Sequence, residues 1–177
     1  MGWKTDETIR NKAQKFKEDY NRLFDERHES MKGIVDVVVP YMKQEHLWED
    51  LEAILNVICV LPSCHFRVYM YSHYYEITGK PHEIITNPDC GVWKVDREIL
   101  LKIQDFADDY EEKELRLRQM ERSAKKEIIT YLEETGLWND LQAVHEMRCC
   151  LPICLLQHNL NERYYELLMA ESEMDEG

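Results

Sequence analysis

Glycine is scarce in this chain, and its placement excludes several enzyme classes. The six glycines of the 177-residue sequence are far apart, at positions 2, 33, 79, 91, 136 and 177. A phosphate-binding loop needs glycines within a few residues of one another, so that backbone amides can approach the phosphate. The Gly-x-Ser-x-Gly turn of many hydrolases needs the same proximity. The sequence therefore predicts neither feature.

Long apolar runs are also missing. No stretch reaches the roughly 18 successive apolar residues that a membrane-spanning helix requires. We find no cleavable export signal after Met1 and no Asn-x-Ser/Thr acceptor site. The six cysteines are therefore expected to be thiols in a reducing compartment. These observations predict an intracellular, cytoplasmic protein with no membrane partner.

Positive charge is in short supply, and the deficit is uneven. The formal net charge is −13; residues 1–90 hold 11 Lys and Arg against 15 Asp and Glu, whereas residues 91–177 hold 11 against 20. Direct binding of nucleic acid is not expected, because it requires clustered Lys and Arg that displace counterions from phosphates. A basic protein partner fits this charge, although acidity also serves simply to keep a helical protein in solution.

What the chain does have is an internal repeat of period 90 without gaps. Shifting the sequence by this period aligns Trp3-Lys4-Thr5-Asp6 with Trp93-Lys94-Val95-Asp96, and Tyr74-Tyr75-Glu76 with Tyr164-Tyr165-Glu166. We call residues 1–90 copy one and residues 91–177 copy two. The pattern predicts a first helical repeat over 1–78, a turn-rich linker over 79–92, and a second helical repeat with an acidic tail over 93–177.

Apolar residues at steps of three and four predict one long amphipathic helix at the start of each copy. In copy two this helix should run from about 97 to 134 and end at Gly136; in copy one it should bend at Pro40. Two shorter helices follow, the last beginning at Pro62 or Pro152. Its predicted inward face in copy one comprises Phe66, Met70, Tyr74 and Ile77. The expected fold is all-α, with two tandem three-helix units related by a pseudo-twofold axis.

Cysteines flank the two Leu-Pro pairs, at Cys59 and Cys64 in copy one and at Cys149 and Cys154 in copy two. A structural zinc site needs about four thiolate or imidazole ligands, usually with closer spacing within each pair. These residues are expected to be core thiols, since cysteine also behaves as a small buried hydrophobe. A metal-thiolate or redox site shared by the two corners is the alternative, and we expect no cofactor.

Positions at which the copies differ are candidates for recognition, because shared residues already have a structural explanation. Copy one has an aromatic and histidine set where copy two has Leu, Asn and Arg: His65, Tyr69, Tyr71 and His73. Copy two has an acidic set along its long helix: Asp105, Asp108, Asp109, Glu111, Glu112 and Glu114. Aromatic side chains are typical of binding hot spots, and carboxylates along a helix resemble a phosphate track in their electric field. Packing of the first set against the rest of the protein, and solvation of the second, are the alternatives.

These sets predict a non-enzymatic protein-interaction module that inhibits or regulates a basic partner, for example a protein that handles nucleic acid. Carboxylates occur at matching places in both copies, but helix capping explains them as well as acid-base catalysis does. A structural protein that forms homo-oligomers through its long helices is the remaining alternative.

Overall fold

The computed structural model describes residues 2–79 and 90–175, with side chains of the last helix described up to residue 172. These residues form six α-helices and one 3-10 turn, and no strand. The helices are α1 (Glu7–Gln44), α2 (Leu51–Val60), α3 (His65–Thr78), α4 (Arg97–Glu134), α5 (Leu141–Cys149) and α6 (Leu155–Asp175), with the 3-10 turn at Leu137–Asn139. The expected all-α class is confirmed. Within the described part of the chain, no helix combines the length and the apolar character needed to cross a bilayer.

The chain divides into two compact units, and neither is one sequence copy. Unit 1 comprises Met1–Asp25 and Leu115–Gly177, and unit 2 comprises Glu26–Glu114. Helices α1 and α4 each contribute one part to unit 1 and the other part to unit 2. Compact units and sequence repeats are therefore different divisions of the chain. Most of the linker expected at 79–92 lies outside the described residues.

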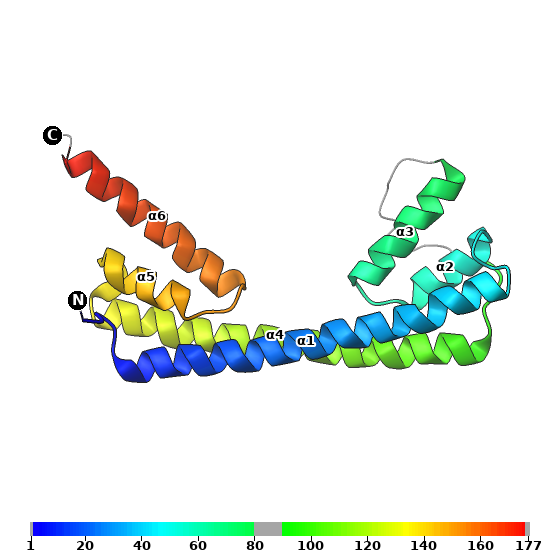
Figure 1. The fold of residues 1–177 in the computed structure, drawn as a ribbon, viewed down its shortest axis with the longest axis horizontal. Helices are drawn as coiled ribbons and strands as arrows, with labels where there is room; N and C mark the ends of the chain where they lie inside the picture. The colour runs from blue at the N-terminus through cyan, green and yellow to red at the C-terminus, as the bar shows by residue number, and fades with distance from the viewer. Residues whose placement is uncertain (1, 80–89, 176–177) are drawn as a thin grey trace. The chain divides into compact units, whose positions relative to one another are not determined.

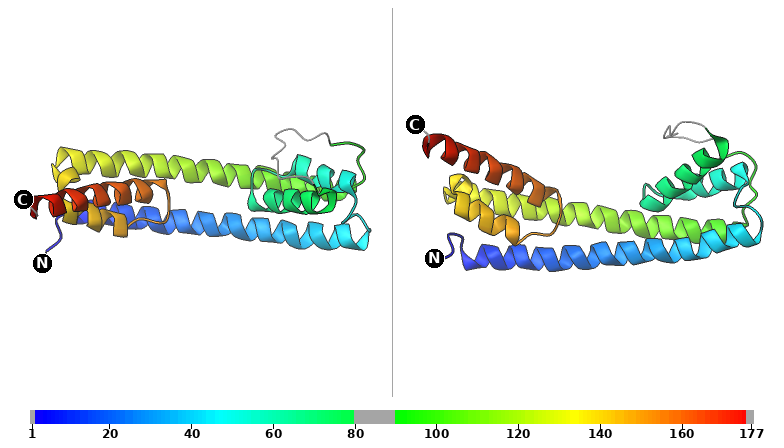
Figure 2. Two further views of the ribbon diagram at one scale, coloured as in Figure 1. Left: turned by 90° about the horizontal axis from the view of Figure 1, so that it is seen from above. Right: turned by 45° about the horizontal axis from the view of Figure 1, so that its top comes forward.

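In unit 1, the first part of α1 lies beside the last part of α4 (Figures 1 and 2). Ile9, Ala13 and Phe16 of α1, at steps of four and three, are buried against Ile128 and Leu132 of α4. Helices α5 and α6 complete this core with fully buried Val144, Met147, Leu156 and Leu160. Each large apolar side chain buried in this way contributes about 1.5–3 kcal/mol relative to exposure.

Unit 2 repeats the plan with the roles of the long helices exchanged. The second part of α1 buries Ile34, Val38 and Met42, and the first part of α4 buries Ile103 and Phe106. Helices α2 and α3 close the core with their buried residues Ala53, Ile54, Val57, Ile58, Phe66 and Met70. Copy one therefore supplies three of the four helical segments of unit 2, and copy two supplies the fourth.

Residues 90 positions apart make the same contacts in the two units. Asp96 N donates to the Tyr41 hydroxyl at 3.0 Å in unit 2, and Asp6 N donates to the Tyr131 hydroxyl at 2.8 Å in unit 1. The ion pair between Lys94 and Asp50, at 2.7 Å, has its counterpart between Lys4 and Asp140, at 3.4 Å.

Helix ends follow the same correspondence. Asp50 and Asp140 are N-caps, and their carboxylates accept hydrogen bonds from Ala53 N at 3.1 Å and Ala143 N at 2.9 Å. Gly136 follows α4 with a φ of 72°, as expected for a left-handed helix end, and His46 follows α1 with a φ of 58°. His46 therefore adopts the same backbone conformation as its glycine counterpart.

Two predicted helix starts were wrong. Helix α1 runs to Gln44 as one element with Pro40 inside it, and the expected bend at Pro40 stays a prediction. Helices α3 and α6 begin at His65 and Leu155 rather than at the prolines, because Leu61 is extended and helix α3 starts only after its N-cap, Cys64.

The buried face of α3 also differs from the prediction. Phe66 and Met70 are buried as expected, and Tyr74 packs half-buried against the same core. The helix also buries Tyr71 and Tyr75, whereas Ile77 is exposed.

Candidate interaction surface

Two of the six acidic residues predicted on α4 are engaged within unit 2. Asp109 accepts hydrogen bonds from Lys113 Nζ at 2.6 Å and from Ser30 Oγ at 2.9 Å. The Lys113 ammonium and the Ser30 hydroxyl together hold the pKa of the Asp109 carboxyl below its usual value, although partial burial opposes them. Glu114 forms an ion pair with Arg27 of α1. Both carboxylates therefore connect α4 to its surroundings.

The other four carboxylates are exposed and form what we call the acidic stripe: Asp105, Asp108, Glu111 and Glu112. Asp108 accepts a hydrogen bond from Gln104 at 2.8 Å. None of the four has an ion pair with any residue that the structure describes. Their spacing of three to four residues places them on one side of α4.

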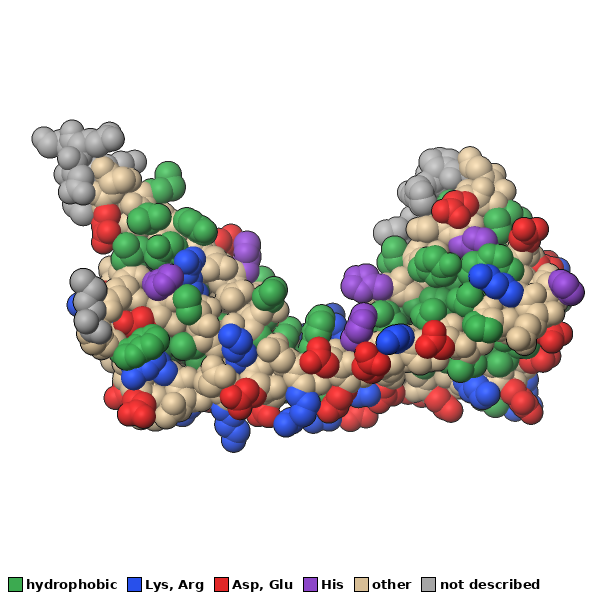
Figure 3. All heavy atoms as spheres, viewed as in Figure 1, with side chains coloured by type: hydrophobic (Ala, Val, Ile, Leu, Met, Phe, Trp, Pro, Cys, Tyr) green, Lys and Arg blue, Asp and Glu red, His purple; other side chains and the backbone are tan. Residues whose placement is uncertain are grey.

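The aromatic set on α3 separates into exposed and buried members. His65 is exposed, and Tyr69 retains 49% of its accessible surface. Tyr71 is only 7% exposed and belongs to the core, so the prediction that it lies on the surface was wrong. Figure 3 shows hydrophobic side chains gathered over α2 and α3, and also over α5 and α6.

His73 makes a contact that is structural. Its Nε2 lies 2.8 Å from the carbonyl oxygen of Trp48, and its ring stacks on the Trp48 indole with centroids 4.1 Å apart. Because a carbonyl oxygen only accepts, Nε2 carries the proton. The counterpart in unit 1 is Arg163, whose Nε donates to the carbonyl oxygen of Trp138 at 3.3 Å. Both side chains attach the last helix of their copy to the turn before the preceding helix.

The cysteines are divided between the two units. Cys59 forms a disulfide with Cys90, which corrects the expectation that Cys59 is a free core thiol. Cys64 is buried, and burial raises the pKa of its thiol. Cys154 is half-buried with its pKa raised in the same way, whereas Cys149 is exposed. Within residues 2–79 and 90–175, no group of three or more His, Cys, Asp or Glu is placed to hold a metal ion.

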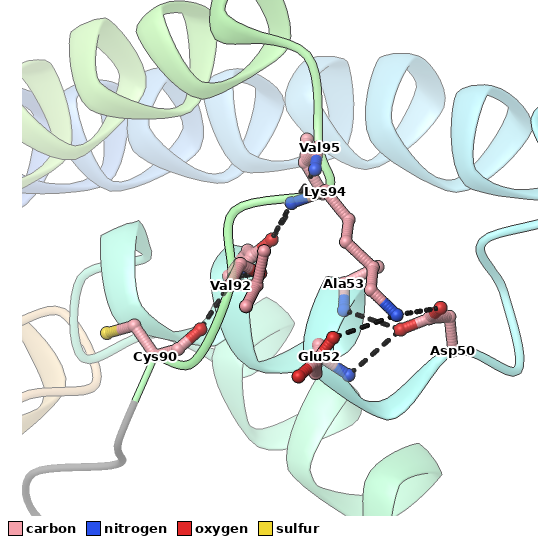
Figure 4. A network of polar contacts seen from close by, with 8 residues as sticks. Asp50, Glu52, Ala53, Cys90, Val92, Lys94 and Val95 are labelled. Carbon is pink, nitrogen blue, oxygen red and sulfur yellow. Dashed lines mark hydrogen bonds and ion pairs between the residues drawn. The ribbon is translucent and has the colours of Figure 1, made fainter.

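The segment that leads into α4 is held against α2 by a network that sequence reasoning missed (Figure 4). The buried Asn56 side chain donates to the carbonyl oxygens of Cys90 at 2.7 Å and Val92 at 3.2 Å, and accepts from Lys94 N at 2.8 Å. Lys94 Nζ lies 2.7 Å from Asp50 and 2.8 Å from Glu52. The sequence offered one sign of this network: Asn56 stands at the position that corresponds to Glu146 in copy two, so both copies have a polar residue there.

A small pocket lies at the N-terminal end of the acidic stripe. Its volume is about 230 Å³, and Val60, Trp93, Leu100 and Leu101 provide its apolar lining. Arg97 and Gln104 complete the wall. Trp93 and Leu101 retain 53% and 52% of their surface, so the pocket opens to solvent. The feature of the sequence that could have indicated this pocket is Leu101, an apolar residue that lies outside the buried stripe of its helix.

Comparison with known proteins gives no relative from which a function could be inferred. No protein-family model, curated protein or solved structure matches the chain.

Proposed function

We propose that this protein is a non-enzymatic interaction module that binds a basic protein through the acidic stripe of α4. The observation that carries the proposal is the set of four exposed carboxylates on one side of a rigid helix, none of them ion-paired within the described chain. A carboxylate can stabilise its own helix by pairing with Lys or Arg three or four residues away, as Asp109 does with Lys113, and no residue of the stripe does so within the described chain.

The spacing of the stripe suits a partner that normally binds nucleic acid. Asp105 and Glu112 are seven residues apart, which is about 10 Å along a helix axis. Four charges over that length give about one charge every 3.5 Å, close to the spacing of about 3.4 Å between phosphates on one strand of DNA. A basic groove shaped for phosphates would meet a similar charge density on α4. The proposal therefore includes inhibition or regulation of such a partner.

Comparison of the two copies supports the same surface. We take them as products of a duplication, because residues 90 apart make the same contacts in units 1 and 2. The positions on α1 that correspond to the stripe are Lys15, Glu18, Asn21 and Arg22. Copy one therefore has one acidic and two basic residues at these positions, and the net negative charge of the stripe is a feature of copy two that the shared fold does not require.

The test begins with affinity purification from the source cells, after which the recovered protein is purified and its affinity measured directly. Reversing three charges, in Asp105→Lys, Asp108→Lys and Glu112→Lys together, should weaken binding at least about tenfold at low salt, because each attraction becomes a repulsion. The matched control reverses Glu26, Glu29 and Asp36, which are exposed on α1 in unit 2 and make no described ion pair. Equal loss in both triple variants, or binding that salt does not weaken, would refute the proposal.

Assembly through apolar contacts is the second candidate function. Tyr165, Leu168 and Met169, near the end of α6, retain 57%, 41% and 65% of their surface. A homo-oligomer that buries them would have a mass that rises with concentration in light scattering, and Met169→Glu would abolish the rise. A constant monomeric mass would leave the interaction module as the function.

The expected cytoplasmic location stays a prediction, and the Cys59–Cys90 bond argues against it, because disulfides persist mainly in oxidising compartments. The same bond removes Cys59 from the metal-thiolate alternative. Alkylation of thiols in protein taken from its source cells, followed by mass measurement, reports whether the pair is oxidised there.

A further inference from the structure

We propose that the pocket at the start of α4 binds one apolar side chain from a basic helix of the partner, while Lys or Arg residues of that helix contact the acidic stripe. This inference depends on the proposed function and adds the chemistry of the partner segment. The pocket and the stripe are neighbours on α4 and both belong to unit 2.

The pocket has the size and the rigidity of a site for one side chain. Its volume of about 230 Å³ is below the range of about 300–1,000 Å³ that is common for sites of whole small molecules. The segment that carries Trp93 is fixed on both sides, through the Asn56 hydrogen bond to Val92 and the ion pair of Lys94 with Asp50. The Cys59–Cys90 disulfide attaches the same segment to α2. Little ordering is therefore required when a side chain enters.

The register of α4 joins the pocket to the stripe. Leu101, Gln104 and Asp108 follow one another at steps of three and four residues, and Glu111 and Glu112 continue the line. Asp108 lies seven residues from Leu101, about 10 Å along the axis, and Glu112 lies eleven residues away, about 16 Å. A partner helix lying along α4 therefore needs an apolar anchor with basic residues seven and eleven positions from it.

Arg97 sets the direction of the partner. Its side chain lines the pocket at the end away from the acidic stripe. A second cation placed there would be repelled, whereas cations on the other side of the anchor would meet carboxylates. The basic residues of the partner must therefore all lie on one side of its apolar anchor.

The same backbone positions in unit 1 carry no such surface. The counterparts of Leu100, Leu101 and Asp105 are Arg10, Asn11 and Lys15. The Arg10 guanidinium lies over the Trp3 ring at 4.8 Å from its centroid, in the place that corresponds to the leucine side of the pocket. Unit 1 therefore shows that the shared fold accepts polar residues at these positions, and that the apolar pocket beside an acidic stripe is specific to unit 2.

This correspondence supplies variants that should fold. Leu101→Asn removes the apolar wall, and Asp105→Lys with Glu112→Arg reverses charge in the stripe; each new residue already stands at the matching position of α1. The probe is a labelled synthetic helical peptide of about 20 residues. It carries one Leu anchor and Lys at the seventh and eleventh positions from the anchor. One version places the Lys residues after the anchor in the sequence and another places them before it. The control peptide has Ser in place of the Leu anchor. Affinity is measured by fluorescence anisotropy on the full-length protein, with circular dichroism to check folding.

We expect the anchored peptide to bind about tenfold to a hundredfold more tightly than the Ser peptide, the effect of burying one large apolar side chain. Leu101→Asn should abolish that difference and leave the salt dependence unchanged. If both peptides bind equally and only the charge variant weakens them, the pocket proposal is wrong and the acidic interaction surface stands. If neither peptide distinguishes wild type from the charge variant, the interaction surface itself is wrong, and the pocket proposal fails with it.

Discussion

The carboxylate of Glu146 should be a major stabilising group of unit 1, and its replacement tests the fold at one point. The side chain is only 6% exposed. It accepts hydrogen bonds from Lys4 N at 2.9 Å, Thr5 N at 2.9 Å, Thr5 Oγ1 at 2.8 Å and Gln142 Nε2 at 3.0 Å. Burial disfavours the ionised form, but the donors from Lys4, Thr5 and Gln142 together outweigh it and lower the pKa of Glu146.

The expected magnitude follows from the donors that lose their acceptor. In Glu146→Ala, the backbone N–H and the hydroxyl proton of Thr5 lose their acceptor, and Thr5 is 4% exposed. Each buried donor without an acceptor costs about 1–3 kcal/mol. We expect the free energy of unfolding of unit 1 to fall by about 3 kcal/mol in Glu146→Ala. Glu146→Gln keeps one acceptor oxygen, so the loss should be about half as large.

The dependence on pH distinguishes the charge from the packing. Because folding lowers the pKa of Glu146, the unfolded state binds more protons just below the ordinary glutamate pKa of about 4.3. The stability from this group is therefore complete above that pH and is lost as the pH falls through the folded-state pKa. Wild type and Glu146→Gln should differ most near neutral pH and converge in acid.

Urea unfolding at several pH values measures how the stability depends on pH, and amide hydrogen exchange measures the loss of the hydrogen bonds to Glu146. Exchange at Thr5 N should accelerate in both variants, while Val95 N, which donates to Asn56 in unit 2, serves as the internal control. A constant difference in stability between wild type and Glu146→Gln across the acid range would refute the role assigned to the carboxylate charge.

Two further predictions concern connectivity. Replacing Cys59 and Cys90 together by Ala should lower the free energy of unfolding by about 3.5 kcal/mol, because the disulfide closes a loop with a sequence separation of 31. Urea titrations under oxidising conditions measure this loss, and equal stability of the variant and the oxidised wild type would contradict the bond. Separate fragments 1–79 and 90–177 should each remain largely unfolded by circular dichroism and gain helix when mixed, because each compact unit takes residues from both fragments. A single fragment that unfolds cooperatively on its own would show the division into two compact units to be wrong.

Much of the secondary structure could be predicted from the sequence. The spacing of Ile9, Ala13 and Phe16 indicates a helix whether or not its partner is known, and Gly136 marks a helix end through its own conformational freedom. The division into units was not predictable in this way. An apolar stripe shows which side of a helix is buried, but Ile9 carries no information that its neighbours are Ile128 and Leu132 of the other copy.

The candidate site shows the same limit. Exposure of Asp105 and Asp108 could be predicted from helical register, since both lie off the apolar stripe. The burial of Tyr71 could not, because tyrosine is common both in cores and on surfaces. The disulfide was missed because Cys90 lies in a turn-rich segment far from Cys59 in sequence. Two such residues are brought together by the tertiary fold and not by any local pattern.

The composition of unit 2 implies that the proposed binding surface needs both copies in one chain. Val60 of the pocket belongs to copy one, whereas Trp93, Leu100 and Leu101 belong to copy two. In an assembly of identical copies, a change that created the pocket in one unit would appear in the other as well. Joining two copies in one chain allows Asn11 to remain polar while Leu101 lines a pocket. The sequence differences between the two halves therefore confine the proposed recognition surface to unit 2, while unit 1 keeps the shared fold without it.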